Sequence, residues 1–186
     1  MICDISITEI NACDCKPGLF AHFDRYKESQ RNWYKEDGQW VLTDELFIED
    51  WSDEKKIQVI DGLKVCIENG GCALGVYHQD KLIGFASVHA ERFGTTNQYA
   101  ELNKMHISNG FRGQGIGKRL FREICEKARQ AGVKKLYISA SPAEDSMAFY
   151  RKLGCADACE INQELQDKEP FDYQLEYDLH SGEHGC

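Results

Sequence analysis

Four glycines lie within the ten residues NGFRGQGIGK, numbered 109–118, and the helical pattern RLFREICEKARQAGV follows at once. Glycine lets the backbone take conformations that other residues avoid, and it lets another group approach closely. The strand-like stretch QYAELNKMHIS precedes the glycines. A strand, a glycine turn and a helix N-terminus place free N–H groups and the positive end of the helix dipole at one point. The stretch therefore predicts a binding site for a phosphate or a diphosphate.

Two common phosphate-binding motifs do not match this stretch. A P-loop needs glycine where Arg112 stands, and it needs serine or threonine where Arg119 stands. A Rossmann fingerprint that begins at Gly113 needs its third glycine where Lys118 stands. A turn whose glycines serve geometry alone is the remaining alternative.

The chain length and the charge limit the fold and the partners. With 186 residues and 42% hydrophobic content, the chain can bury one core but is short for two domains, so we expect a single domain over residues 1–186. The formal charge of −9 argues against nucleic acid as a partner, because phosphate contacts need clustered Lys and Arg. A monomer and a homodimer are equally compatible with the sequence.

The N-terminus and the cysteines indicate the compartment. MICDISITEI lacks the basic and apolar regions of a signal peptide, and no membrane span is expected. Nine cysteines are an odd number and fit reduced thiols, so we expect a cytoplasmic protein. Cys13-x-Cys15 and the tail HSGEHGC lack the second CxxC pair and the regular histidine spacing of a zinc site, so no metal is expected.

Hydrophobic periodicity predicts an α/β fold, a mixed sheet with helices on its faces. The expected strands cover residues 4–10, 72–78, 81–89, 98–108, 134–141 and 173–180. The expected helices cover 52–71, 119–133 and 142–154, and an irregular and helical region rich in aromatics covers 19–40. Gln79-Asp80 predicts a hairpin turn. Ser141-Pro-Ala-Glu144 predicts a capping box for the last helix, which Gly154 ends.

One irregularity is expected in the strand at 98–108. Its apolar residues follow one phase at Ala100 and Leu102 and the other phase at Met105 and Ile107. A period of two allows such a step only with a β-bulge. A central strand buried on both faces would give the same pattern without a bulge.

The pattern Arg112-x-x-Gly115-x-Gly117 after this strand resembles the acyl-CoA-binding motif of the GNAT superfamily of N-acetyltransferases. The resemblance covers about residues 73–155 and includes FYRKLG in the later helix. It implies the GNAT fold, a central mixed and mostly antiparallel sheet that splays at the CoA site, and it favours the bulge. It also implies acetyl-CoA as cosubstrate. The diphosphate and the packed helix would then keep Gly115 and Gly117 bare.

The resemblance also implies which residues bind the cosubstrate. Backbone groups of the strand would pair with pantetheine, the turn amides would hold the diphosphate, and the later helix would add two residues. The implied set is Met105, His106, Ile107, Arg112, Gly113, Gln114, Gly115, Ile116, Gly117, Lys118, Ser146 and Phe149.

Acyl transfer from a thioester to an amine needs an acid for the departing thiolate. Tyr150 matches the tyrosine of the superfamily's FY…LG element and is expected to be this acid. Its phenol stays protonated at neutral pH, so it can donate a proton. A packing role beside Phe149 is the alternative.

The same reaction needs a base, because an alkylammonium is protonated at neutral pH. Glu101 is expected to be this base, since several relatives carry their base glutamate at this place in the strand. A water chain, His89 and His106 are the alternatives, and Asn103 is expected to orient the amine.

The expected activity is therefore transfer of an acetyl group from acetyl-CoA to a primary amine of a small molecule by direct attack. One alternative acceptor is the N-terminal amino group or a lysine of a protein. A different class is a non-catalytic CoA-binding sensor domain. The stretch TDELFIEDWSDE, residues 43–54, interleaves acids with aromatics and, with the negative net charge, predicts a cationic acceptor.

Overall fold

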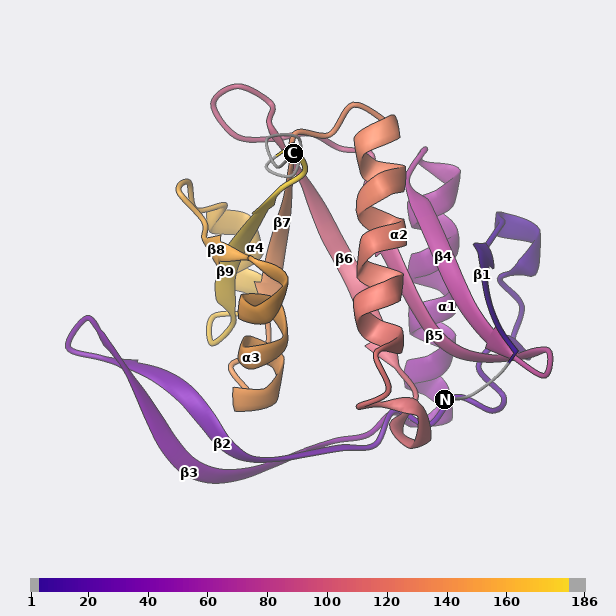
Figure 1. Ribbon diagram of the computed structural model, residues 1–186, viewed down its shortest axis with the longest axis horizontal. Coiled ribbons are helices and arrows are strands. Elements are labelled where there is room, and N and C mark those ends of the chain that lie inside the picture. The colour runs from indigo at the N-terminus through magenta and orange to yellow at the C-terminus, as the bar shows by residue number, and fades with distance from the viewer. Residues whose placement is uncertain (1–3, 181–186) are drawn as a thin grey trace.

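A computed structural model describes residues 4–180 of the chain (Figure 1). Its centre is a seven-stranded sheet in the order β1-β4-β5-β6-β7-β9-β8. Neighbouring strands are antiparallel except for the parallel pair β6 and β7. The strands are β1 (Ile5–Glu9), β4 (Cys72–His78), β5 (Lys81–Val88), β6 (Tyr99–Ile107), β7 (Lys135–Ala140), β8 (Ala156–Asp157) and β9 (Tyr173–Asp178). The predicted mixed, mostly antiparallel sheet is confirmed.

Helices cover both faces of this sheet. They are α1 (Asp53–Glu68), α2 (Ile116–Gln130), α3 (Glu144–Leu153) and α4 (Gln163–Lys168), with short 3₁₀ turns η1 (Ala12–Asp14) and η2 (Asn109–Phe111). Figure 1 shows α2 in front of the sheet and α1 behind it. None of the helices within residues 4–180 is long and apolar enough to span a bilayer.

Two hydrophobic clusters fix these helices on opposite faces of the sheet. On one face Leu120 and Ile124 of α2 pack with Ala86 of β5, and all three are fully buried. On the other face Leu63 of α1 packs in a cluster with Phe85, the neighbour of Ala86. Successive side chains of a strand point to opposite faces, so β5 contributes to both cores.

Strand β6 carries the predicted β-bulge. Its register against β5 runs Ser87↔Lys104 and then Val88↔Leu102, which leaves Asn103 as the extra residue. Pairing with β7 covers Tyr99 to Glu101 only. Beyond this point β6 and β7 diverge (Figure 1), and residues 102–107 form an edge that β7 does not pair. We call these residues the free edge of β6.

The region at 19–40 differs from its prediction. Residues 27–49 form a separate two-stranded hairpin, β2 (Lys27–Glu36) and β3 (Gln39–Glu49). The turn between them is Asp37-Gly38, with φ of 48° and 82°, and positive φ at both positions is what a two-residue hairpin turn requires. The hairpin crosses below α3 in Figure 1, and Trp33 N–H donates to the carbonyl of Pro142 at 2.9 Å.

The predicted capping box at Ser141 does not form. Helix α3 begins at Glu144, and Ala143 occupies the N-cap position without a side-chain cap. The carboxylate of Glu144 instead accepts hydrogen bonds from Arg31 of β2, at 2.9 Å from Nε and 2.6 Å from Nη2. The Glu144 carboxylate therefore binds the hairpin instead of the backbone N–H of Ser141, as a capping box would require. Gly154 ends α3 with φ of 96°, as predicted.

Candidate active site

The glycine turn joins the free edge of β6 to the N-terminus of α2. Gly113 and Gly115 have φ of 74° and 80°, a left-handed backbone that favours glycine, and a Cβ on either would meet nothing within 4 Å. Arg119 N–H makes the first helical bond, to the carbonyl of Gly115 at 3.1 Å. The N–H groups of residues 116–118 therefore have no partner within the helix. Free amides and a helix dipole meet here, as an anion site requires.

At Gly117 a side chain is disfavoured for a different reason. A Cβ on it would lie 3.3 Å from Cε2 and 3.4 Å from Cζ of Phe149, and 3.7 Å from Cγ1 of Ile107. The packed helix α3, rather than open space for a diphosphate, limits this position. The contact joins three of the predicted cosubstrate residues, one each from β6, α2 and α3.

The remaining turn residues divide by exposure. Gln114 and Lys118 are exposed, and Gln114 Nε2 donates to the carbonyl of Gly110 at 3.2 Å. The side chain of Ile116 is buried in the core under α2, so only its backbone faces outward from the turn. Lys118 is thus a cationic side chain placed on the first turn of α2.

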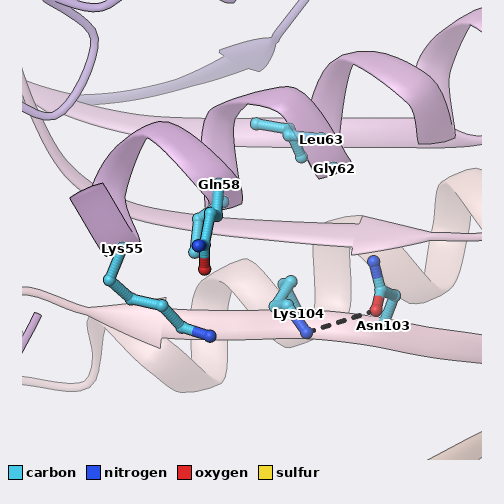
Figure 2. A pocket seen from close by; sticks show the side chains of 7 residues that line it. Lys55, Gln58, Gly62, Leu63, Asn103 and Lys104 are labelled. Carbon is cyan, nitrogen blue, oxygen red and sulfur yellow. Dashed lines mark hydrogen bonds between the residues drawn. The ribbon is translucent and has the colours of Figure 1, made fainter.

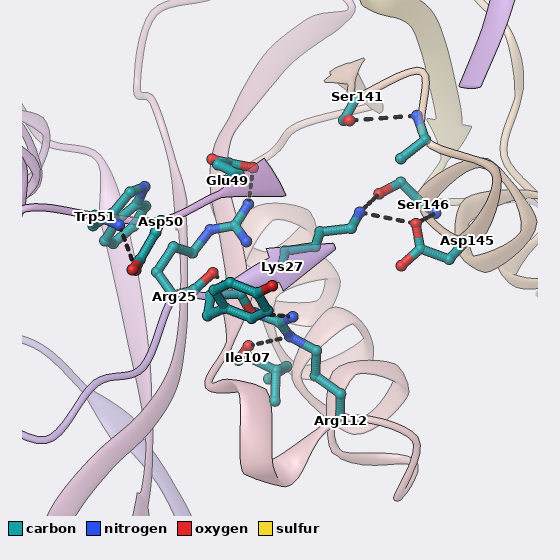
Figure 3. Close-up of polar contacts among 12 residues, drawn as sticks. Arg25, Lys27, Glu49, Asp50, Trp51, Ile107, Arg112, Ser141, Asp145 and Ser146 are labelled. Carbon is teal, nitrogen blue, oxygen red and sulfur yellow. Dashed lines mark hydrogen bonds and ion pairs between the residues drawn. The ribbon is translucent and has the colours of Figure 1, made fainter. Parts of the chain in front are cut away.

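Arg112 holds the turn in place rather than extending into solvent (Figure 3). Its guanidinium donates to the carbonyls of Ile107 at 2.8 Å, Tyr26 at 2.8 Å and Arg25 at 3.3 Å. These bonds tie the turn to the end of β6 and to the chain that enters β2. Three carbonyl partners leave this side chain few donors for a ligand, so its predicted contact with the cosubstrate stays a prediction.

Two basic residues that the sequence did not single out lie beside Arg112. Arg25 pairs with Glu49 at 2.5 Å, and Lys27 reaches α3 (Figure 3). Lys27 Nζ lies 2.6 Å from Oγ of Ser146 and 2.9 Å from Oδ1 of Asp145, and its side chain is only 12% exposed. Ser146, predicted to bind the cosubstrate, therefore has its hydroxyl paired already. The Asp37-Gly38 turn was the signal that could have revealed β2 and this lysine.

His106 and Met105 lie on the free edge with side chains on opposite faces. The His106 ring is edge-on to Trp51 at 5.0 Å and tilted against Phe85 at 5.5 Å. Burial, followed by the charge of Arg25, lowers the pKa of His106 well below its usual value, so the ring is neutral at pH 7. Met105 packs against the core on the α2 side. Neutral His106 can fill space or accept a proton, but it carries no charge.

Tyr150 lies on α3 with its ring against the core. The ring packs at 5.2 Å from Phe149 and 6.3 Å from Phe121. Burial, with smaller effects of Cys155 and Asp172, raises the pKa of Tyr150 above its usual value, so the phenol holds its proton at neutral pH. Within residues 4–180 no group accepts a hydrogen bond from this hydroxyl. The proton is therefore available to a ligand.

Glu101 is paired with His89. Its Oε2 lies 3.0 Å from Nδ1 of His89, and the Glu101 side chain is 18% exposed. Contacts with Cys66 and with Glu101 raise the pKa of His89 to about 10 despite partial burial. The histidine is therefore protonated at neutral pH and forms an ion pair with Glu101. This pair lies where β6 and β7 part, because Glu101 is the last β6 residue that β7 pairs.

Asn103, the bulge residue, lines a small pocket between β6 and α1 (Figure 2). The pocket holds about 110 Å³ and includes Lys55 and Gln58 of α1 and Lys104 of β6. The amide oxygen of Asn103 accepts from Lys104 Nζ at 3.3 Å. Two ammonium groups beside Asn103 disfavour a cationic ligand here.

Residues 4–180 contain no group of three His, Cys, Asp or Glu side chains that could hold a metal ion. Cys13 and Cys15 are free thiols, as are the other cysteines of this range. The tail HSGEHGC covers residues 180–186, and all of it except His180 lies outside the described residues.

Comparison with known sequences extends this description. Residues 24–155 match the model of the acetyltransferase (GNAT) family. The chain is 29% identical over 80 residues to the uncharacterized N-acetyltransferase YjgM of Escherichia coli (strain K12), which is 42% of this chain and 47% of that protein. It is 32% identical over 76 residues to glucosamine 6-phosphate N-acetyltransferase of Trypanosoma brucei brucei, or 40% and 50% of the two chains. The matches span about half the length of these curated relatives.

Solved structures match almost the whole chain. A putative streptothricin acetyltransferase from Bacillus anthracis, solved in complex with acetyl coenzyme A, superposes with a TM-score of 0.67 at 14% identity over 93% of this chain and 96% of that one. Nourseothricin acetyltransferase superposes with a TM-score of 0.63 at 16% identity, over 92% and 95%. At such identities the likeness concerns the fold. The family model covers well over half of the sequence, and the chain therefore belongs to the GNAT family of acetyltransferases.

Proposed function

We propose that this protein is an N-acetyltransferase that transfers an acetyl group from acetyl-CoA to a primary amine of a small molecule by direct attack. The observation that carries the proposal is the junction of three features at one point: the free edge of β6, the glycine turn and the N-terminus of α2. Acetyl-CoA, when bound, would supply the thioester that is the acyl donor. Structural neighbours solved with acetyl coenzyme A or coenzyme A support this choice of cosubstrate.

The residues present suit CoA. The free amides of residues 116–118 and the side chain of Lys118 would hold the diphosphate by charge and hydrogen bonding. Residues 102–107 are a strand edge that β7 does not pair, so backbone groups of this edge can pair with the extended pantetheine amides. Arg112 would act through the turn that it fixes, and the Gly117–Phe149 contact would set the distance between α2 and α3.

Two side chains would handle the protons. Tyr150 would donate its proton to the departing thiolate, because its hydroxyl is protonated and unpartnered within residues 4–180. Glu101 would accept the ammonium proton, directly or through water, while His89 holds it in place.

The acceptor is proposed to be cationic, but not because of the whole acidic stretch 43–54. Glu45 accepts a hydrogen bond from Tyr34, and Glu49 pairs with Arg25. Asp50 accepts from the N–H of Trp51 at 2.8 Å. These acids are largely paired by the protein itself. Recognition of a cation would therefore rest on other carboxylates. The free thiols within residues 4–180 support the proposal of a cytoplasmic location.

Release of CoA thiol across a panel of amines tests the proposed function. The full chain with acetyl-CoA is expected to release thiol with at least one small primary amine, and product mass should increase by one acetyl group. Acetyl-CoA alone should raise the Tm, since a ligand selective for the folded state stabilises it. A raised Tm without acetylation of any small amine, peptide N-terminus or lysine peptide would identify a CoA-binding sensor instead.

A further inference from the structure

A second cavity lies away from the glycine turn and shares no lining residue with the pocket at Asn103. It holds about 460 Å³, several times the volume of the Asn103 pocket. One wall is the hairpin, with Trp33 and Trp40, and the other is the segment from β8 to β9, with Phe171, Asp172 and Tyr173. A volume of several hundred Å³ is the usual size of a small-molecule site.

The walls of this cavity are aromatic. The rings of Trp40 and Tyr173 stack with centroids 3.4 Å apart and planes at 21°. Lys35 Nζ lies 5.9 Å from the Trp40 centroid, so this indole already faces a cation. Phe171 is 69% exposed and Trp40 is 39% exposed. Covering such exposed aromatic surface with the apolar part of an organic ligand is favourable.

The cavity also contains a carboxylate without a partner. Within residues 4–180 no side chain donates to the carboxylate of Asp172, whose backbone carbonyl accepts from Gln174 Nε2 at 3.2 Å. Burial, followed by Glu169 and Glu49, raises the pKa of Asp172 to about 7. Asp157, the other carboxylate of the cavity, is paired with Arg151. A cationic ligand would supply Asp172 with the charge that it lacks.

Asp172 immediately precedes β9, whose first residue Tyr173 pairs with Ala140, the last residue of β7. It therefore lies at the end of the sheet where β7 no longer pairs with β6. The charge of Lys104, on the free edge of β6, lowers the pKa of Asp172, and Asp172 in turn raises the pKa of Tyr150. The carboxylate is therefore within electrostatic range of both the strand and the tyrosine. An acceptor anchored at Asp172 would therefore lie beside the end of the sheet where β6 and β7 part.

We propose that this cavity anchors a second ammonium group of the acceptor, so that the substrate is a molecule with at least two amines, one bound at Asp172 and the other acetylated. This proposal rests on the proposed function and narrows its substrate class. An ammonium paired with a carboxylate holds its proton more tightly, and a protonated amine is no nucleophile. The group at Asp172 is therefore the anchor, and the apolar part of the acceptor lies against Trp33, Trp40 and Phe171.

A pair of probes that differ by one amine tests this inference. Cadaverine and pentylamine share a five-carbon chain, and only cadaverine can place one ammonium at Asp172 while presenting another amine. Wild-type kcat/KM should favour cadaverine. Asp172→Asn should lower the ratio of the two kcat/KM values by at least about tenfold, the loss expected when one partner of a desolvated charge pair is removed. Asp157→Asn is the matched control, since it changes a paired carboxylate of the same cavity.

A second variant tests the contact between the acceptor and the aromatic residues of the cavity. Phe171→Ala removes a largely exposed ring and leaves the buried core intact. It should weaken cadaverine binding by about twofold to fivefold, the effect of an exposed aromatic contact.

Other outcomes would overturn the anchor. If Asp172→Asn slows both probes equally, Asp172 acts on the reacting amine as a base. If neither kcat/KM value changes by more than about twofold, well below the loss of a charge pair, Asp172 contacts no acceptor. Calorimetry with cadaverine and no acetyl-CoA separates the two proposals: binding that Asp172→Asn abolishes supports the anchor even if acetyl transfer is absent, and no binding to the wild type overturns it.

Discussion

Nδ1 of His89 lies 3.0 Å from Oε2 of Glu101, which makes the predicted base one half of an ion pair. The pKa of His89 is raised to about 10, through Cys66 and Glu101, from an ordinary value of 6.5. A raised folded-state pKa stabilises the protein fully below pH 6.5, and the contribution disappears as the pH rises to about 10.

This shift predicts the pH dependence of stability. His89→Asn should lower the Tm most at pH 6 and below, and the difference from the wild type should vanish towards pH 10. Thermal unfolding from pH 5 to 10 measures it, with His180→Asn as a control for a histidine outside the sheet. A difference that stays constant across this range would mean that His89 contributes by packing alone.

Glu101→Gln should alter the pH profile of catalysis. If Glu101 is the base, kcat/KM should fall at neutral pH and recover partly at high pH, where the free amine becomes abundant. Acetyl-CoA affinity, measured by calorimetry, should persist. An unchanged acidic limb of the profile would favour a water chain as the base.

Tyr150→Phe keeps the ring and removes the proton. The packing against Phe149 and Phe121 should survive, so the Tm and acetyl-CoA affinity should stay near the wild-type values. The expected loss in kcat is about 10²–10⁴, the range for a general acid. A loss of less than about threefold, well below that range, would make Tyr150 a packing residue.

Gly117→Val should destabilise the protein even without a ligand. The new side chain would meet the Phe149 ring, whose nearest atom lies 3.3 Å from the position of a Cβ. Overpacking of this kind costs about 1–3 kcal/mol, which urea unfolding can measure. Adding Phe149→Leu should restore part of the stability. If Gly117→Val leaves stability intact and abolishes only CoA binding, the glycine serves the ligand and not the helix contact.

Arg112→Lys should loosen the turn while keeping the charge. Lysine cannot reproduce three separate bonds to the carbonyls of Ile107, Tyr26 and Arg25. Each lost bond from a charged donor costs on the order of 1–3 kcal/mol, so the urea midpoint should fall. Arg119→Lys is the control, because Arg119 makes a single 3.4 Å bond to Ile5. An equal fall of the urea midpoint in the two variants would contradict this role of Arg112 in holding the turn.

The sequence by itself determined the features that depend on residues adjacent in the chain. Gln79-Asp80 gives the β4–β5 hairpin with positive φ at both positions, 49° and 60°. Gly154 ends α3, and the glycines at 113 and 115 form a left-handed turn before α2. The phase step in β6 was compatible with a bulge and with a strand buried on both faces, and the resemblance to the family favoured the bulge that the structure has. Each signal is local, since φ and ψ depend first on the residue itself.

Only the tertiary structure decided where distant side chains meet. The hairpin pairing of β2 with β3 and its contact with α3 decided the partners of Glu144 and Ser146, which local capping rules could not foresee. The stacking of Trp40 on Tyr173 joins residues far apart in the chain. Such contacts arise from burial and charge balance over the whole fold, and they leave no periodic trace in the sequence. The glycine turn was therefore readable in advance, whereas the cavity at Asp172, which we propose for the acceptor, became visible only when the chain was folded.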